Sequence, residues 1–189
     1  MWIALTIVAA VIVLLIIVIW ASYNGLVKLD ERVNEAWSDI TVQLKLRADL
    51  VPNLVETVKG FTKHESEAIK AVSDARARMM GARSVQSSAE ADKSLTGALS
   101  RLMAVSESYP ELKANTNFQD LSSKLADTED KLQAARRFYN AGVKELNTKI
   151  KLFPTNLINK IVGHFKAREY FEVDEAERAT IDKAPEVKF

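Results

Sequence analysis

The chain contains no cysteine and only two histidines, His64 and His164, among its 189 residues. The absence of cysteine excludes disulfide bonds, thiol catalysis and thiolate metal sites, and it fits a reducing compartment. A histidine-based metal site within one chain would need both histidines, and they lie a hundred residues apart with no supporting spacing. The sequence therefore predicts no metal site and no cofactor.

The chain also lacks the short motifs that mark several classes of enzyme. It has no glycine-rich phosphate loop, no HExxH pair and no serine in a nucleophile elbow. Asp49 and Glu56 lie seven residues apart on one side of an expected helix, but a cap and a hydrogen-bonding stripe explain them better than an acid/base pair does. We predict a protein without catalytic residues. The remaining alternative is an enzyme with a polar pocket around Asn53 and Asn140.

One long hydrophobic stretch is present, from Trp2 to Ala21, with Thr6 as its one polar side chain and no charge. A helix of this length matches a hydrocarbon core of about 30 Å. Trp2, Trp20 and Tyr23 stand at its two ends, as expected for an interfacial aromatic belt. We predict a transmembrane helix over residues 1–22. A cleaved signal peptide fits less well, because the stretch is too long and bulky residues occupy the place of a cleavage site.

The side of the membrane follows from the flanking charges. No Lys or Arg precedes the stretch, whereas Lys28 and Arg32 follow it. The positive-inside rule therefore favours a cytoplasmic C-terminal domain. The preference rests on these two basic residues, and two acidic residues lie next to them.

The remaining chain shows the periodicity of long amphipathic helices and no strand pattern. Apolar residues recur at steps of three and four from Tyr23 to Phe61, and Pro52 should kink this helix without breaking it. Further helices are expected over about 64–83, from a capping box at Ser87 to about 108, and from an N-cap at Asn117 to about 153. The fold class is therefore all-α: a single N-terminal transmembrane helix followed by an antiparallel four-helix bundle, residues 23–152, with long first and fourth helices.

Polar and aromatic residues interrupt the apolar faces at a few positions. A candidate interhelical polar seam consists of Gln43, Asn53, Asn140 and Asn147. Such residues can set helix register. The alternative is a ligand or partner groove between the first and fourth helices. Trp37 is a candidate packing anchor, either in the core or at a contact with another subunit.

Charge is segregated near the C-terminus, although the net charge of the chain is only +1 and shows no bias toward nucleic acid. Residues 131–168 contain nine Lys or Arg and one acid, and residues 169–189 contain seven acids and three bases. We predict an amphipathic, membrane-proximal segment over 153–172 and a polar, disordered tail over 173–189. The residues expected at the membrane interface are Trp2, Trp20, Tyr23, Lys160, Phe165, Lys166 and Arg168. The alternative is that this segment packs on the bundle and pairs with the acidic tail.

Several runs resemble the signatures of the LemA family over nearly the whole chain except the tail. The first covers Tyr23-Asn24, Ala36-Trp37-Ser38, Val42-Gln43-Leu44-Lys45 and Pro52-Asn53-Leu54-Val55-Glu56-Thr57-Val58-Lys59-Gly60. The later ones cover Tyr109-Pro110, Leu112-Lys113-Ala114-Asn115, Asn117-Phe118, Ala135-Arg136, Tyr139-Asn140, Asn147 and Phe153-Pro154. Gly163-His164-Phe165 departs from the usual Gly-Phe.

The resemblance implies a bacterial protein with an N-terminal membrane helix, a helical cytoplasmic domain and no assigned catalytic activity. It also implies a genetic neighbourhood with membrane metalloproteases of the HtpX type, and one relative in magnetosomes. We therefore expect a single-pass protein of the bacterial inner membrane whose partner is the lipid bilayer. Its predicted function is that of a scaffold that forms homo-oligomers and organises membrane partners. The alternative is a regulatory adaptor of a membrane protease.

Overall fold

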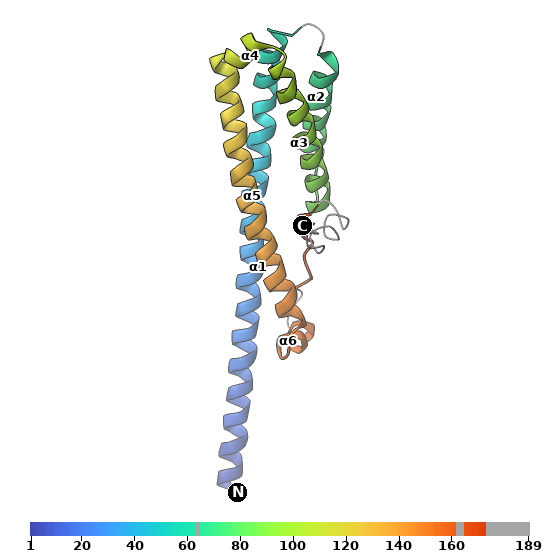
Figure 1. Ribbon diagram of the computed structural model, residues 1–189. Helices are drawn as coiled ribbons and strands as arrows, with labels where there is room; N and C mark the ends of the chain where they lie inside the picture. The colour runs from blue at the N-terminus through green and yellow to red at the C-terminus, as the bar shows by residue number, and fades with distance from the viewer. Residues whose placement is uncertain (63–64, 162–164, 173–189) are drawn as a thin grey trace, which may run out of the picture. The chain divides into compact units, whose positions relative to one another are not determined.

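The computed structural model describes residues 1–62, 65–161 and 165–172; these residues contain six α-helices and no strand (Figure 1). The helices are α1 (Trp2–Lys59), α2 (Ser66–Gly81), α3 (Val85–Glu107), α4 (Pro110–Ala114), α5 (Thr116–Lys151) and α6 (Thr155–Ile161). The all-α prediction, with a long apolar N-terminal helix, is confirmed. His64, Gly163, His164 and the tail predicted at 173–189 lie outside the described residues.

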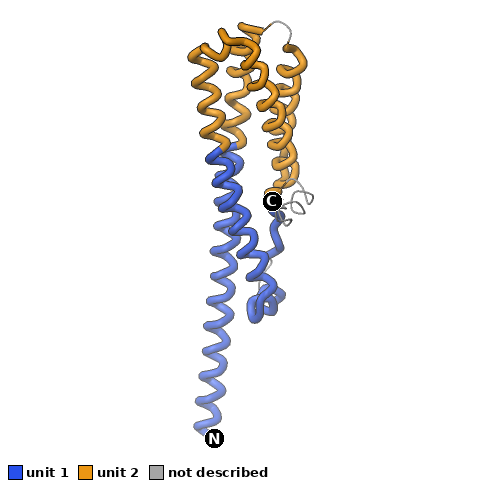
Figure 2. Tube along the Cα trace, viewed as in Figure 1, with its two compact units in different colours: residues 1–43, 130–170 blue, residues 44–129, 171–189 orange. Residues whose placement is uncertain are grey.

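The chain divides into two compact units (Figure 2). Unit 1 consists of residues 1–43 and 130–170, so it holds the N-terminal part of α1, the C-terminal part of α5, and α6. Unit 2 consists of residues 44–129 and 171–189 and holds the rest of α1 and α5 together with α2, α3 and α4. The boundary between the units falls within α1 and within α5. It does not test the segments predicted from the sequence, residues 1–22, 23–152, 153–172 and 173–189, which stay predictions.

The apolar stretch forms the first third of α1 and has almost no cover. Its side chains from Trp2 to Trp20 are exposed except for half-buried Val18, and the first buried side chain of the helix is Leu26. Within the described residues, α1 is the one helix that is long and apolar enough to cross a membrane. Its composition and exposure are compatible with a membrane anchor.

The core of unit 1 is formed by α1 and α5. The two helices bury apolar side chains at steps of three, four or seven residues: Leu26, Val33, Ala36 and Ile40 on α1, and Leu132, Tyr139, Val143 and Leu146 on α5. Gly142 allows a close approach, because a Cβ placed there would lie 3.3 Å from Cγ2 of Val33. The Trp37 and Tyr139 rings pack with their centroids 5.7 Å apart. These contacts follow from the apolar periodicity of both helices.

Unit 2 has a core to which each of its helices contributes. The buried apolar side chains are Leu44, Ala48, Val51, Leu54 and Val58 on α1, Val72, Ala75 and Met79 on α2, Leu95, Leu99 and Leu102 on α3, Leu112 on α4, and Phe118, Leu121 and Leu125 on α5. The short helix α4 was not predicted. Pro110 does not only end the preceding helix; it stands in the first turn of α4, where its missing N–H leaves no hydrogen bond unmade.

Two of the predicted helix starts are wrong by a few residues. Helix α3 is capped by Ser84 and Ser87, each accepting a hydrogen bond from the other's backbone N–H, so the box does not lie at Ser87 and Glu90. The N–H of Phe118 donates to Oδ1 of Asn115 at 3.0 Å, so Asn115 caps α5 in place of Asn117. In both cases a short polar side chain earlier in the chain satisfies the free N–H groups and lengthens the helix.

Pro52 lies inside α1, which continues through it as expected. A proline has no N–H, so the carbonyl of Ala48, four residues earlier, lacks its helical partner. Arg76 of α2 takes that place, because its Nε–H donates to the carbonyl oxygen of Ala48 at 2.9 Å. The interruption in α1 thereby becomes a contact between two helices of unit 2.

We predict that Arg76→Ala lowers the free energy of unfolding by about 1–2 kcal/mol, since a hydrogen bond from a charged donor is lost. In a Pro52→Ala background the new N–H at position 52 can reach the carbonyl of Ala48, so the same change should cost less. Chemical denaturation of the detergent-solubilised protein, followed by circular dichroism, measures both losses. An equal loss in the two backgrounds would contradict this role of Arg76.

Candidate functional site

The carboxylates singled out in the sequence are engaged on the surface of α1. Asp49 pairs with Lys45 at 3.3 Å, and Glu56 pairs with Lys59 at 2.8 Å, so each interacts with a neighbour on its own helix. Asn53 is exposed, and with Glu56, Asn117, Asp120 and Lys124 it lines a shallow hollow of about 390 Å³ in unit 2. Among the residues that the structure describes, no group of three or more His, Asp or Glu is arranged to hold a metal ion.

A buried polar cluster lies in unit 2 and consists of Arg47 of α1, Asp92 and Thr96 of α3, and Glu129 of α5. Nη1 of Arg47 lies 2.6 Å from Oδ1 of Asp92 and 2.7 Å from Oε2 of Glu129, and it also donates to Oγ1 of Thr96 at 3.0 Å. The side chains of Arg47 and Asp92 are only 5% and 3% exposed. The cluster therefore joins three helices through one guanidinium group.

The electrostatics of this cluster are governed by burial. Removal from water lowers the pKa of the Arg47 guanidinium, and the nearby Glu129 carboxylate opposes that shift. An arginine stays protonated at neutral pH even where burial disfavours its charge, so Arg47 supplies a positive charge to two carboxylates. Removing one member of such a buried cluster strongly destabilises the fold, because the charge that remains has neither an ionic partner nor water to solvate it.

The Arg47 cluster was not predicted from the sequence, although a signal was present. Arg47 lies seven residues after Ile40 and three after Leu44, in phase with the buried side chains of α1. Asp92 lies three residues before Leu95, in phase with those of α3. Two opposite charges on the apolar faces of two helices would have predicted a buried pair.

We expect Arg47→Ala to destabilise the protein by about 3–5 kcal/mol, since it leaves buried carboxylates unpaired. A double variant, Arg47→Met with Asp92→Leu, removes the most buried pair and leaves only the partly exposed Glu129 without the guanidinium group, so it should lose less than Arg47→Ala. Lys124→Ala is the matched control, because Lys124 and Asp120 pair at 2.7 Å on the surface, and its loss should cost less than about 1 kcal/mol. Thermal unfolding of the wild-type protein and these three variants in detergent measures the losses. A control as damaging as Arg47→Ala would contradict the burial argument.

The non-helical segment Phe165–Tyr170, which we call the strap, is held against α5 in unit 1. The side-chain amide of Asn147 satisfies both backbone groups of Arg168, accepting from its N–H at 2.8 Å and donating to its carbonyl at 2.9 Å. The Tyr139 hydroxyl donates to the carbonyl of Glu169 at 2.9 Å. Burial raises the pKa of the Tyr139 phenol; the charge of Arg168 lowers it and that of Glu169 raises it, both by less. The hydroxyl therefore keeps the proton that it donates in this hydrogen bond.

The strap is also attached to α1 and to α6. The guanidinium of Arg168 pairs with Asp30 of α1 at 2.8 Å and donates to Asn34 at 3.2 Å. Asn159 of α6 donates to the carbonyl of Phe165 at 3.0 Å and accepts from its N–H at 3.2 Å. Two asparagine amides therefore pair with the backbone of the strap in the way that a neighbouring strand would.

The structure places the predicted residues in different surroundings. Of the candidate seam, Asn147 bonds to the strap, Gln43 and Asn140 are half-buried in unit 1, and Asn53 is exposed in unit 2. The candidate anchor, Trp37, is half-buried against Tyr139.

The residues predicted at a membrane interface are mostly accessible. Trp2, Trp20, Lys160 and Lys166 are exposed. The rings of Tyr23 and Phe165 meet edge to face, with their centroids 5.9 Å apart. Arg168 is also exposed, and it pairs with Asp30.

Removing the Asn147 amide should loosen the strap. We predict that Asn147→Ala speeds hydrogen exchange at the backbone of residues 165–170 by at least about tenfold, since two hydrogen bonds worth about 1 kcal/mol each are lost. Asn147→Asp keeps the acceptor for the Arg168 N–H and should have a smaller effect. Thr148→Ala, at the next and exposed position, serves as the control. Unchanged exchange in Asn147→Ala, measured by mass spectrometry, would show that the amide does not hold the strap.

Comparison with known proteins identifies the family. The family model described as "LemA family" matches residues 36–189, which is most of the chain. The match begins at Ala36, within α1, so it leaves out the apolar stretch and covers the rest of α1, the helices that follow and the strap. The resemblance found in the sequence is confirmed.

The relatives carry two kinds of name. The chain is 26% identical to the magnetosome protein MamQ of Magnetospirillum gryphiswaldense over 175 residues, which cover 79% of this chain and 64% of that one. It is 37% identical to magnetosome protein MamQ 2 of Paramagnetospirillum magneticum over 82 residues, or 43% of this chain and only 30% of the relative. It is 25% identical to protein LemA of Metamycoplasma hominis over 164 residues, or 84% of this chain and 73% of the relative.

Proposed function

Because the chain belongs to the LemA family, we propose that it is a non-enzymatic helical scaffold, anchored in a membrane by α1, whose copies associate. The observation that carries the proposal is the continuity of α1. One helix of 58 residues begins as an exposed apolar stretch and then supplies core side chains to both units. In hydrocarbon a helix satisfies all of its own backbone groups, so this stretch can enter a bilayer without a change of structure.

The proposed location is the inner membrane of a bacterium, with the C-terminal domain in the cytoplasm. Lys28 and Arg32 follow the apolar stretch, are exposed, and supply the positive charge that the cytoplasmic side favours. Arg32 also pairs with Glu145 at 3.5 Å and lies over the ring of Phe138 at 5.3 Å.

The non-enzymatic role is supported by two observations. The names of the relatives are not names of enzymes. The carboxylates Asp49 and Glu56 are exposed and paired with lysines of the same helix, as is usual for a solvated helix surface.

The association of copies is supported by apolar side chains that remain exposed outside the apolar stretch. Val42 and Leu46 lie one helical turn apart on α1 and are 50% and 49% exposed. Covering such a pair stabilises a contact by about 1–2 kcal/mol, so several copies with repeated contacts are needed for a lasting assembly. In a scaffold that organises membrane partners, such contacts would determine how many copies assemble.

The test is the mass of the detergent-solubilised full-length protein, measured by light scattering and corrected for bound detergent. We expect a mass of several subunits. The double variant Val42→Gln with Leu46→Gln should reduce that mass, because it replaces the exposed apolar pair with polar side chains of similar size.

Met80→Gln is the matched control, since Met80 of α2 is 45% exposed and its replacement should leave the mass unchanged. A wild-type protein that is monomeric or dimeric would contradict the scaffold. The adaptor of a membrane protease would then take its place, and co-purification with such a protease would be the next measurement.

A further inference from the structure

An exposed apolar patch, which we call the foot, lies on the turn after α5 and on α6; it consists of Leu152, Phe153, Leu157 and Ile161. Their exposed fractions are 53%, 78%, 49% and 81%. On the other side of α6, Thr155 and Ile158 are buried. Helix α6 therefore packs on unit 1 with one side and presents apolar side chains with the other. The buried side of α6 agrees with the alternative in which this segment packs on the bundle, whereas its position at a membrane interface stays a prediction.

Lysines surround the foot. Lys149 and Lys151 precede it on α5, Lys160 lies within α6, and Lys166 lies in the strap; all four are exposed. Residues 146–161 contain three lysines and no acidic residue. An exposed apolar patch with lysines and no acid is the composition of a helix that lies in a membrane interface, where long basic side chains reach the anionic headgroups.

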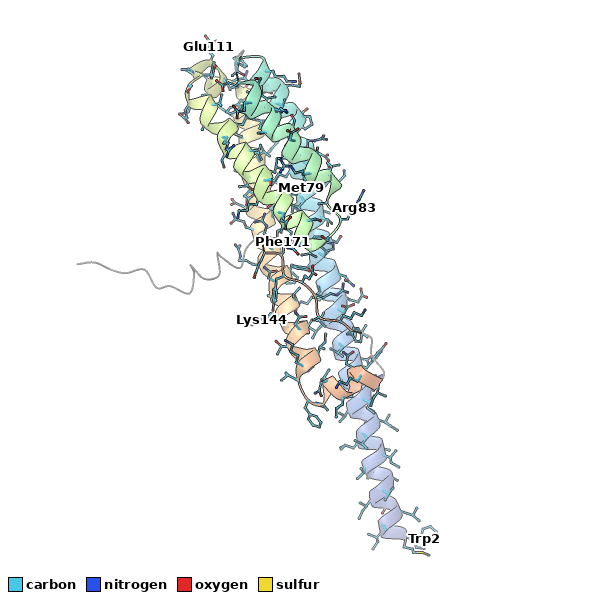
Figure 3. The ribbon with its side chains drawn as sticks, turned by 90° about the vertical axis from the view of Figure 1, so that its right-hand side faces the viewer. Trp2, Met79, Arg83, Glu111, Lys144 and Phe171 are labelled. Atoms are coloured by element: carbon cyan, nitrogen blue, oxygen red, sulfur yellow. The ribbon has the colours of Figure 1, made fainter. Side chains whose placement is uncertain are left out.

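The foot is held close to the end of the apolar stretch of α1. The Tyr23 ring, two residues beyond Ala21, contacts the Phe165 ring with a centroid distance of 5.9 Å. The backbone of Phe165 is tied in turn to α6 by the two hydrogen bonds of Asn159. Within unit 1, α6 lies beside α1 in both views, at the end of α5 that is nearer the apolar stretch (Figures 1 and 3).

We propose that the foot binds the surface of the same bilayer that α1 enters, with its apolar side chains below the headgroups and its lysines among anionic lipids. This inference rests on the membrane anchoring proposed above but not on the association of copies. The position of the Tyr23–Phe165 contact favours a lipid surface over a second protein chain, because it holds the foot where α1 leaves the hydrocarbon. The same segment therefore gives the protein a second attachment to the membrane.

The absence of cysteine makes a direct test feasible in the full-length protein. Single-cysteine variants at Leu157 in the foot, at Lys144 on an exposed part of α5 and at Ile12 in the apolar stretch are spin-labelled and reconstituted into vesicles. The vesicles contain phosphatidylcholine with or without phosphatidylglycerol. Collision of each label with oxygen, which dissolves in lipid, is compared with collision with a water-soluble nickel chelate.

We expect the label at position 157 to favour oxygen and to lie about 5–10 Å below the headgroup boundary. The label at position 144 should favour nickel, and the label at position 12 should be deepest. If the label at 157 collides mainly with nickel while the label at 12 collides mainly with oxygen, the foot does not bind the bilayer, but the proposed anchoring by α1 still holds. Nickel access at both 12 and 157 would overturn the anchor itself.

Coverage of the foot by protein is the remaining outcome. A label at 157 that is shielded from both oxygen and nickel, or that broadens through contact with the label of another copy, would also overturn the lipid proposal. The role of charge is tested by Lys160→Glu with Lys166→Glu, which should make the label at 157 shallower in vesicles with phosphatidylglycerol and change it less in pure phosphatidylcholine. Lys144→Glu is the matched control and should change neither. If the double variant leaves the depth of the label unchanged in the anionic vesicles, the proposed contact between these lysines and anionic lipid headgroups is wrong.

Discussion

The structure depends on the continuity of α1, whose backbone N–H and C=O groups are satisfied within the helix along its apolar stretch. From Trp2 to Trp20 the side chains are exposed and nearly all apolar, so only a helix that satisfies its own N–H and C=O groups suits this stretch. The helix does not end where the apolar stretch ends, because neither Gly25 nor any proline before Pro52 stops it, and it goes on to supply core side chains such as Leu26 and Val33. The soluble helices are thus assembled on a continuation of the proposed membrane anchor and need no linker.

In this fold, polar side chains fix which turns of neighbouring helices meet, which periodic apolar faces do not. Apolar faces bring helices together, but Leu and Val contacts discriminate little between neighbouring turns. Arg47 links α1 to charged partners on α3 and α5, and Asn147 and Asn159 capture a segment that has no regular secondary structure. These contacts are directional, so they add specificity to a core whose stability comes from burial.

Much of the fold could be predicted because periodicity is a property of the sequence itself. The apolar steps of three and four predicted the long helices, and the composition of residues 2–21 predicted the apolar segment. The starts of α3 and α5 were missed because several serines and asparagines near each start could serve as caps, and only the structure selects Ser84 and Asn115. The strap could not be predicted at all, since its partners Asn147 and Tyr139 lie about twenty to thirty residues earlier and no periodic pattern relates them. The Arg47 cluster was predictable in principle from charges in phase with the apolar faces.

The carbonyl of Ala48 has a consequence for the register of unit 2. Along an uninterrupted helix every carbonyl four residues before an N–H is already occupied, so a second helix that packs on it could slide by a turn with little change in hydrogen bonding. Pro52 leaves one carbonyl unoccupied, and Arg76 occupies it. One missing hydrogen atom therefore marks a single axial position on a long and otherwise repetitive rod, and α2 has one place at which its arginine finds an acceptor.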